Sequence, residues 1–174
     1  MTPDGIDVDA LAATLAAKPV KAGFLIPSYH NPTGLVMPPA KRQAVLEVFA
    51  RYEIPVIEDG FNEELRYSGA HVAPLLALAG KGNNVVYIGS FSKILFPGLR
   101  LGWVVADREL IATLESIKRS MNIHTSFLDQ ALLYEYLNSG AFEKYLRRAR
   151  KVYRQRHEAA IRLATALIPH RRIW

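Results

Sequence analysis

The sequence predicts an α/β fold, with a mainly parallel sheet flanked by helices, and three observations lead to this prediction. Short continuous apolar runs, typical of strands buried on both faces, alternate along the chain with longer segments that carry apolar residues at helical spacing. Polar residues follow the ends of several of these runs, which is where ligands bind in such sheets. With 174 residues, half of them apolar, the chain can form one domain with a sizeable core.

Each element of this fold has its own local signal. The predicted strands are apolar runs that end at proline, acids or glycine, and they lie at 22–28, 54–59, 84–89 and 101–106. The predicted helices have apolar residues three and four apart, and they lie at 7–17, 39–52, 107–122, 126–138 and 142–167. Proline near the start of the second helix and Asp107 before the third are typical helix beginnings.

The composition excludes several classes of protein. The chain has no cysteine, so it has neither disulfides nor a thiolate metal site, and it suits a reducing compartment. No apolar run approaches the roughly 18 residues that a membrane span needs. The first residues have neither the basic end nor the apolar stretch of a signal peptide. A soluble cytoplasmic protein that uses no metal is therefore expected.

The positive charge is concentrated near the end of the chain. The formal net charge is +6, and residues 144–174 contain ten lysines and arginines against one acid, Glu158. Such a strip can bind nucleic acid or phosphorylated ligands. It can also be the solvated face of a helix whose acidic partners lie elsewhere in a longer chain. The second interpretation is favoured, because neither a DNA-binding motif nor interleaved aromatic residues accompany the charge.

Three predicted strands lead directly to chemically useful side chains. Lys93 lies among apolar residues, which favour an uncharged, nucleophilic amine, and its flanking hydroxyls and Arg100 are natural phosphate ligands. Asp59 ends a buried strand and can pair with a cationic ring nitrogen. The amide of Asn31 can bind a ligand oxygen. Taken alone, each has a more ordinary explanation: a surface lysine, a turn-forming or helix-capping aspartate, and a turn asparagine.

Taken together, these residues resemble a known family. The chain reads Pro27-Ser28-Tyr29-His30-Asn31-Pro32-Thr33-Gly34, then Ile57-Glu58-Asp59, then Ser90-Phe91-Ser92-Lys93 with Arg100 shortly after. This order and spacing resemble the fold-type I aminotransferases of class I/II, which depend on pyridoxal 5′-phosphate (PLP). The likeness is strongest to aminoadipate/kynurenine-type aminotransferases and to the aminotransferase-like domain of MocR/GntR-type regulators. It covers nearly the whole chain.

The resemblance implies a role for each site residue. Lys93 would bind the cofactor covalently and later move a proton, and Asp59 would face the ring nitrogen. Asn31 would donate to the ring's phenolic oxygen, while Ser90 and Arg100 would hold the phosphate. It also implies that the strand at 101–106 runs antiparallel to the others, and that both edges of the sheet lack the strands that flank them in the family.

Two departures from the family pattern accompany the resemblance. Where the family usually has a tyrosine after the aspartate, the nearest residue is Phe61, which has no hydroxyl to donate. The family's earlier phosphate-binding segment and its later small domain also have no counterpart here. Residues 1–140 are therefore predicted to be a partial PLP-binding large domain, and 141–174 a long connecting helix toward a small domain that is missing. The chain is expected to be the middle of a longer protein.

Three functions remain open on the sequence alone. The first is an aminotransferase, a homodimer in its full-length form, that transfers an amino group from an amino acid to a 2-oxo acid. The second is the PLP-binding effector domain of a transcription regulator, which would contact DNA only through a domain not present in this chain. The third is an inactive gene fragment that does not retain PLP.

Overall fold

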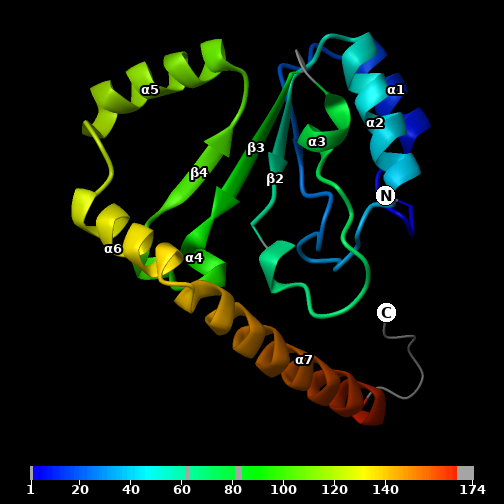
Figure 1. The fold of residues 1–174 in the computed structure, drawn as a ribbon. Helices are drawn as coiled ribbons and strands as arrows, with labels where there is room; N and C mark the ends of the chain where they lie inside the picture. The colour runs from blue at the N-terminus through cyan, green and yellow to red at the C-terminus, as the bar shows by residue number, and fades with distance from the viewer. Residues whose placement is uncertain (1, 62, 81–83, 168–174) are drawn as a thin grey trace.

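The computed structural model describes residues 2–61, 63–80 and 84–167, and it contains a four-stranded sheet (Figure 1). The strands follow the spatial order β1-β2-β3-β4. The first three pair in parallel and β4 pairs antiparallel with β3. Their bounds are Gly23–Leu25, Val56–Asp59, Val85–Ser90 and Gly102–Val105. The predicted fold class, all four strands and the reversed direction of the last are confirmed.

Every predicted helix is present within two residues of its expected bounds. These are α1 (Val8–Ala17), α2 (Pro39–Arg51), α5 (Arg108–Asn122), α6 (Phe127–Asn138) and α7 (Ala141–Leu167). The sequence did not predict the short helices α3 (Leu75–Ala79) and α4 (Phe91–Ile94), or the 3₁₀ turns η1 (Glu63–Leu65) and η2 (Pro97–Leu99). Segments of three to five residues are too short to show a helical period.

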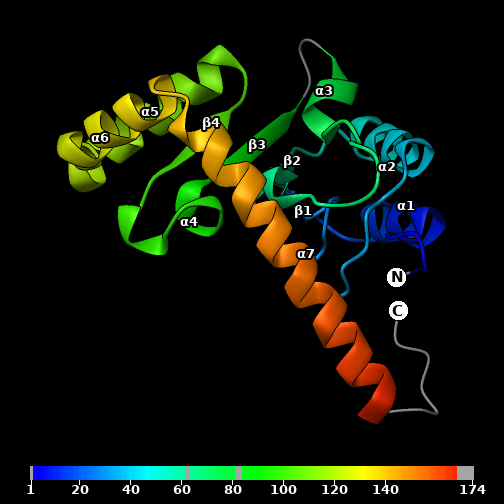
Figure 2. The ribbon, with the colours of Figure 1, turned by 60° about the horizontal axis from the view of Figure 1, so that its bottom comes forward.

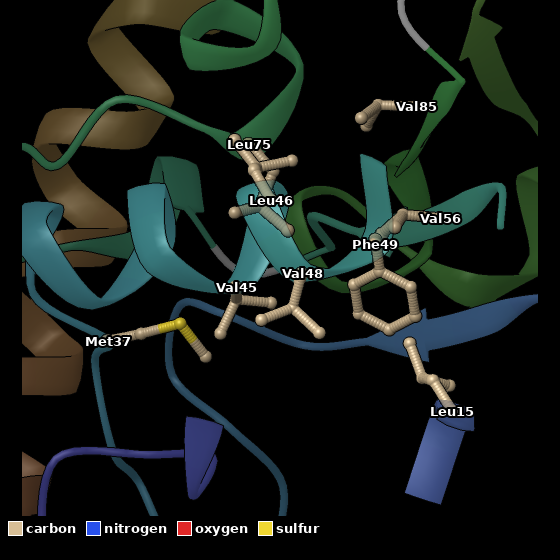
Figure 3. Packing of buried hydrophobic residues seen from close by; sticks show 9 residues of the cluster. All are labelled: Leu15, Met37, Val45, Leu46, Val48, Phe49, Val56, Leu75 and Val85. Carbon is tan, nitrogen blue, oxygen red and sulfur yellow. The ribbon is translucent and has the colours of Figure 1, made fainter. Parts of the chain in front are cut away.

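The hydrophobic core lies between the sheet and the three helices α1, α2 and α3, as Figure 3 shows. Val56 of β2 and Val85 of β3 point into it from the sheet. The largest contributor from α2 is Phe49. Its ring lies so close to Gly23 that a β-carbon on Gly23 would come within 2.4 Å of the Phe49 Cζ atom. The members of the core cluster are Leu15, Met37, Val45, Leu46, Val48, Phe49, Val56, Leu75 and Val85.

The opposite face of the sheet is largely uncovered in the described chain. Because side chains alternate along a strand, residues next to Val56 and Val85 point away from the core. On the two edge strands this leaves Phe24 of β1 59% exposed and Val104 of β4 42% exposed. As the resemblance implies, no further strand of the described residues flanks β1 or β4. An apolar face of this kind is typical of a surface that another layer of structure covers.

Helices α5 and α6 lie beyond β4, and α7 runs from them back past the sheet (Figure 2). None of the residues of α5 and α6 is buried, and α7 buries Leu146. The apolar side of α5, formed by Leu110, Leu114, Ile117 and Met121, is exposed. Among the described residues, no helix is both long enough and apolar enough to span a membrane.

Candidate active site

Asp59 and Ser90 lie at the same rim and on the same face of the sheet. Both are the last residues of parallel neighbouring strands, β2 and β3, so they share the carboxyl end of the sheet (Figure 1). Asp59 pairs with Ile88, and Ser90 follows two residues later on the same side of β3. Their common face is the one turned away from the core helices.

Lys93 stands on a short helix that begins at this rim. Ser90 is the N-cap residue of α4, and its hydroxyl accepts a hydrogen bond from the backbone N–H of Ser92 at 3.2 Å. Lys93 therefore lies in the turn that directly follows the strand, and its side chain is exposed. The expectation of an apolar environment for its amine was wrong for the described chain, because the apolar neighbour Ile94 turns into the protein instead.

Arg100 is brought back to the same helix by the turn η2. The backbone N–H of Phe91, the first residue of α4, donates to the carbonyl of Leu101 at 3.0 Å, and Ser90 pairs with Gly102. Arg100, which precedes Leu101, therefore lies near the start of α4. Its backbone is left-handed, with φ 52° and ψ 32°, a conformation that arginine adopts at a cost. Its guanidinium is exposed and donates to the carbonyl of Pro97 at 3.3 Å.

Asn31 lies on the loop that follows β1, the strand next to β2. The loop closes on itself through hydrogen bonds between His30 and Leu35 and between Gly34 and His30. The peptide bond between Asn31 and Pro32 is cis. The Asn31 side chain is exposed, and within the described residues it makes no hydrogen bond, so its amide is available to a ligand.

The carboxyl group of Asp59 is half-buried. Burial raises its pKa, and a backbone hydrogen bond from Phe61 opposes this by stabilising the charged form. Asp59 lines a cavity of about 110 Å³ together with Pro27, Ser28, Glu63, His71 and Tyr87. A half-desolvated carboxylate with a single backbone donor gains from a cationic partner, which is what a protonated ring nitrogen provides.

Gly60 and Tyr87 form a close contact next to Asp59. The Tyr87 hydroxyl donates to the carbonyl of Gly60 at 3.3 Å, and a β-carbon on Gly60 would lie 2.2 Å from that hydroxyl oxygen. Burial, with nearby acids, raises the pKa of Tyr87 to about 12, so the hydroxyl stays protonated. Glycine at this position lets the chain turn away from β2 against the tyrosine.

Two buried charged residues, which the sequence did not identify, support the loops that carry Asn31 and Asp59. Arg42 of α2 is fully buried and donates to the carbonyls of Met37 at 2.8 Å, Ala73 at 2.9 Å and Pro27 at 3.1 Å, and to the Ser28 hydroxyl at 2.7 Å. It therefore joins the segment before Asn31 to the end of the loop after Asp59.

Glu58, the neighbour of Asp59, supports the same region from the sheet. It is 1% exposed, and its carboxylate accepts the backbone N–H groups of Leu75 at 2.8 Å and Leu76 at 3.0 Å, the start of α3. Burial raises the pKa of Glu58, while these hydrogen bonds and the charge of Arg42 lower it. A sequence signal existed: an arginine within the apolar stretch of a helix and an acid inside a strand both imply buried partners.

The donor set at the rim suits PLP. A lysine amine, a carboxylate, an amide, a hydroxyl and a guanidinium match its aldehyde, ring nitrogen, phenolic oxygen and phosphate. The described residues contain no group of three or more acids and histidines placed to hold a metal ion. The sheet with its flanking helices has the architecture of part of the large domain of a PLP-dependent transferase.

The particular family follows from comparison with known proteins. The profile of the aminotransferase class I and II family matches residues 3–167. The chain belongs to this family, whose members are PLP-dependent. This confirms the resemblance predicted from the motifs.

Relatives of two kinds share the sequence. The chain is 34% identical over 176 residues to aromatic-amino-acid aminotransferase 1 of Thermococcus litoralis, covering 98% of this chain and 42% of the relative. It is 36% identical over 168 residues to a 2-aminoadipate transaminase of Thermus thermophilus, covering 95% of this chain and 42% of that relative. It is also 35% identical over 138 residues to an uncharacterized HTH-type transcriptional regulator of Bacillus subtilis, covering 79% and 28%.

Solved structures show the same fold. A kynurenine aminotransferase of Pyrococcus horikoshii superposes with a TM-score of 0.91 at 34% identity, over 98% of this chain and 43% of that one. An α-aminoadipate aminotransferase of Thermus thermophilus gives a TM-score of 0.89 at 36% identity, over 97% and 43%. The chain thus spans less than half the length of these relatives.

Proposed function

We propose that this chain is the PLP-binding part of an aminotransferase that exchanges the amino group of an amino acid with the carbonyl oxygen of a 2-oxo acid. The observation that supports the proposal is that Asp59 and Ser90 end neighbouring parallel strands, and that α4 with Lys93 begins directly after Ser90, in a chain of this family. The relatives named for aromatic amino acids, 2-aminoadipate and kynurenine support an amino-acid substrate.

Each residue has a task in this proposal. When bound, PLP supplies an electron sink that stabilises negative charge at the substrate α-carbon. Asp59 pairs with the protonated ring nitrogen and keeps it protonated. Ser90 and Arg100 donate hydrogen bonds to the phosphate, and Asn31 donates to the phenolic oxygen. The Lys93 amine would hold the cofactor covalently, and as a free amine it would take a proton from the substrate α-carbon and return it.

Phe61 alters one feature of this site. It provides an aromatic ring and no hydroxyl at the position nearest to the family's tyrosine. One hydrogen bond to the phenolic oxygen is therefore missing, worth about 1 kcal/mol. Binding of PLP should survive this loss, whereas the pH optimum of the reaction should shift.

A second candidate function is an effector domain of a transcription regulator. The observation in its favour is the similarity to HTH-type transcriptional regulators. In that case the same residues bind PLP without sustained turnover, and a separate domain contacts DNA.

In the aminotransferase, we propose a cytoplasmic homodimer in which residues 1–140 form part of the large domain and the helix from 141 leads toward a small domain. Residues 168–174 of that second segment lie outside the described residues.

The test is a titration of the purified chain with PLP, followed by visible absorption. We expect a weak, slowly exchanging complex with a visible band and no transamination by the isolated chain. Lys93→Ala should abolish the band, whereas Lys118→Ala should preserve it. Lys118 is an exposed lysine of α5, and its amine donates a hydrogen bond to the Asn122 side chain. A band that survives in Lys93→Ala would refute the lysine assignment. No band in the wild-type chain would favour the inactive fragment.

A further inference from the structure

Residues 63–67, in the loop that follows Asp59, contact one side of the long helix α7 (Figures 1 and 2). The guanidinium of Arg150 donates through Nε to the carbonyl of Glu64 at 2.7 Å, and Arg154 donates to the carbonyl of Tyr67. Arg150 and Arg154 are four residues apart and so lie on the same side of α7. Both acceptors are backbone atoms, so the bonds hold the path of the loop itself.

A third residue of α7 completes the contact. The imidazole of His157 packs against the ring of Tyr67, with ring centroids 5.7 Å apart. Residues 150, 154 and 157 follow helical spacing along one side of α7 and reach two carbonyls and one ring within four residues of the loop. Hydrogen bonds from charged donors are the stronger kind, and Arg150 is half-buried, which limits competition from water.

The held segment connects directly to the carboxylate of Asp59. The N–H of Gly60 donates to the carbonyl of Ile88 at 2.9 Å, and the backbone N–H of Phe61, two residues after Asp59, lowers the pKa of that carboxyl by favouring its charged form. The position of the Phe61 N–H therefore affects the charged form of the Asp59 carboxyl. A loop held by α7 at Glu64 and Tyr67 limits the movement of that donor.

We propose that Arg150 and Arg154 are positioning residues, which hold the loop after Asp59 against α7 and so keep the Asp59 carboxylate aimed at the ring nitrogen of PLP. The inference rests on the proposed function for its link to the cofactor. It also gives two charges of the basic strip at 144–174 a local role within the fold.

Amide hydrogen exchange of the full chain tests the first step, without any ligand. In Arg150→Ala/Arg154→Ala the amides at 63–67 should exchange about tenfold faster, because local opening loses two charged hydrogen bonds. The matched control is Arg148→Ala/Arg156→Ala, which removes two arginines of the same helix that make no hydrogen bond with the described residues. Equal exchange in the two variants would overturn the proposal.

PLP binding tests the second step. The dissociation constant for PLP should rise about tenfold in Arg150→Ala/Arg154→Ala, and the circular dichroism of the bound cofactor should weaken. Arg150→Lys/Arg154→Lys should restore part of both, since lysine also donates to carbonyls, and the control should match wild type. Faster exchange with unchanged affinity and dichroism would refute the positioning role. A wild-type chain that binds no PLP would refute the proposed function and the link to the cofactor, whereas the exchange result would still decide whether α7 holds the loop.

Discussion

Glu58 and Asp59 are adjacent acids in one strand, and they face opposite sides of the sheet. Glu58 points into the covered side, where α3 donates two backbone hydrogen bonds to it and Arg42 lies near. Asp59 points to the uncovered side and has one backbone donor. A carboxylate therefore supports the structure on one face and is available to bind a cofactor on the other. Burial and partners, rather than residue type, separate the two roles.

The two faces differ in the same way for apolar side chains. The covered face contains the whole hydrophobic cluster, in which Phe49 is 3% exposed, whereas Phe24 on the other face is 59% exposed. Stability of the described chain therefore depends on the covered face. The uncovered face contributes the functional rim and a surface that lacks a packing layer.

The largest effect is expected from Arg42. Arg42→Leu removes four hydrogen bonds and leaves Glu58 buried without its nearby cation. Breaking a buried charged network of this kind costs about 5 kcal/mol. Urea denaturation followed by circular dichroism should show a chain that is largely unfolded. Arg148→Leu, an exposed arginine of α7, should change the unfolding free energy by less than about 0.5 kcal/mol. Similar values for the two variants would contradict the role given to the covered face.

A pair of phenylalanines compares the two faces directly. Phe49→Ala should lower the free energy of unfolding by about 3 kcal/mol, because it leaves a cavity in the core. Phe24→Ala should lower it by less than about 1 kcal/mol, because most of that ring already contacts water. The measurement is again the urea midpoint. A large loss in Phe24→Ala would mean that the uncovered face is packed in solution, for instance between two copies of the chain.

Replacement of Arg100 should change the free energy of unfolding and the affinity for PLP in opposite directions. Its left-handed backbone favours glycine, so Arg100→Gly should raise the free energy of unfolding by about 1 kcal/mol. The same change should weaken binding of PLP and leave binding of unphosphorylated pyridoxal unchanged. Glu53, with φ 53° in the turn after α2, is the matched control. Glu53→Gly should stabilise similarly and bind PLP as the wild type does. Equal loss of PLP and pyridoxal in Arg100→Gly would remove the phosphate role.

The smallest effect on stability is expected at Asp59. The difference in stability between the wild type and Asp59→Asn should depend on pH. Burial raises the pKa of Asp59 above its unfolded value of 3.8, so the folded chain binds a proton at Asp59 more tightly than the unfolded chain does. The stability of the wild type relative to Asp59→Asn should therefore fall as the pH rises from below 3.8 through the raised pKa, and then level off. PLP affinity should show the opposite trend, since only the carboxylate pairs with the ring cation. A flat difference in stability across this range would mean that Asp59 is not desolvated.

Most of the fold follows from local patterns. The four strands and five long helices were predicted because buried apolar runs and helical periodicity are properties of neighbouring residues. The rim was predictable because parallel strands end at the same edge, so residues after each run must meet there. The placement of Lys93 on the helix α4 was not, because four residues show no period. The solvent exposure of Lys93 was also missed, since apolar neighbours in sequence say nothing about which way each side chain turns.

The sequence by itself thus determined the class of fold, the order of its elements and the residues at the carboxyl rim. The tertiary structure decided which face each rim residue sees, that Arg42 and Glu58 hold the two site loops, and that α7 reaches back to the loop after Asp59. The physical reason is separation along the chain. Arg42 bonds to residues up to 31 positions away, and Arg150 bonds to a carbonyl 86 positions away. Such contacts arise only when packing brings distant backbone groups together, and no local pattern specifies which donor reaches which acceptor.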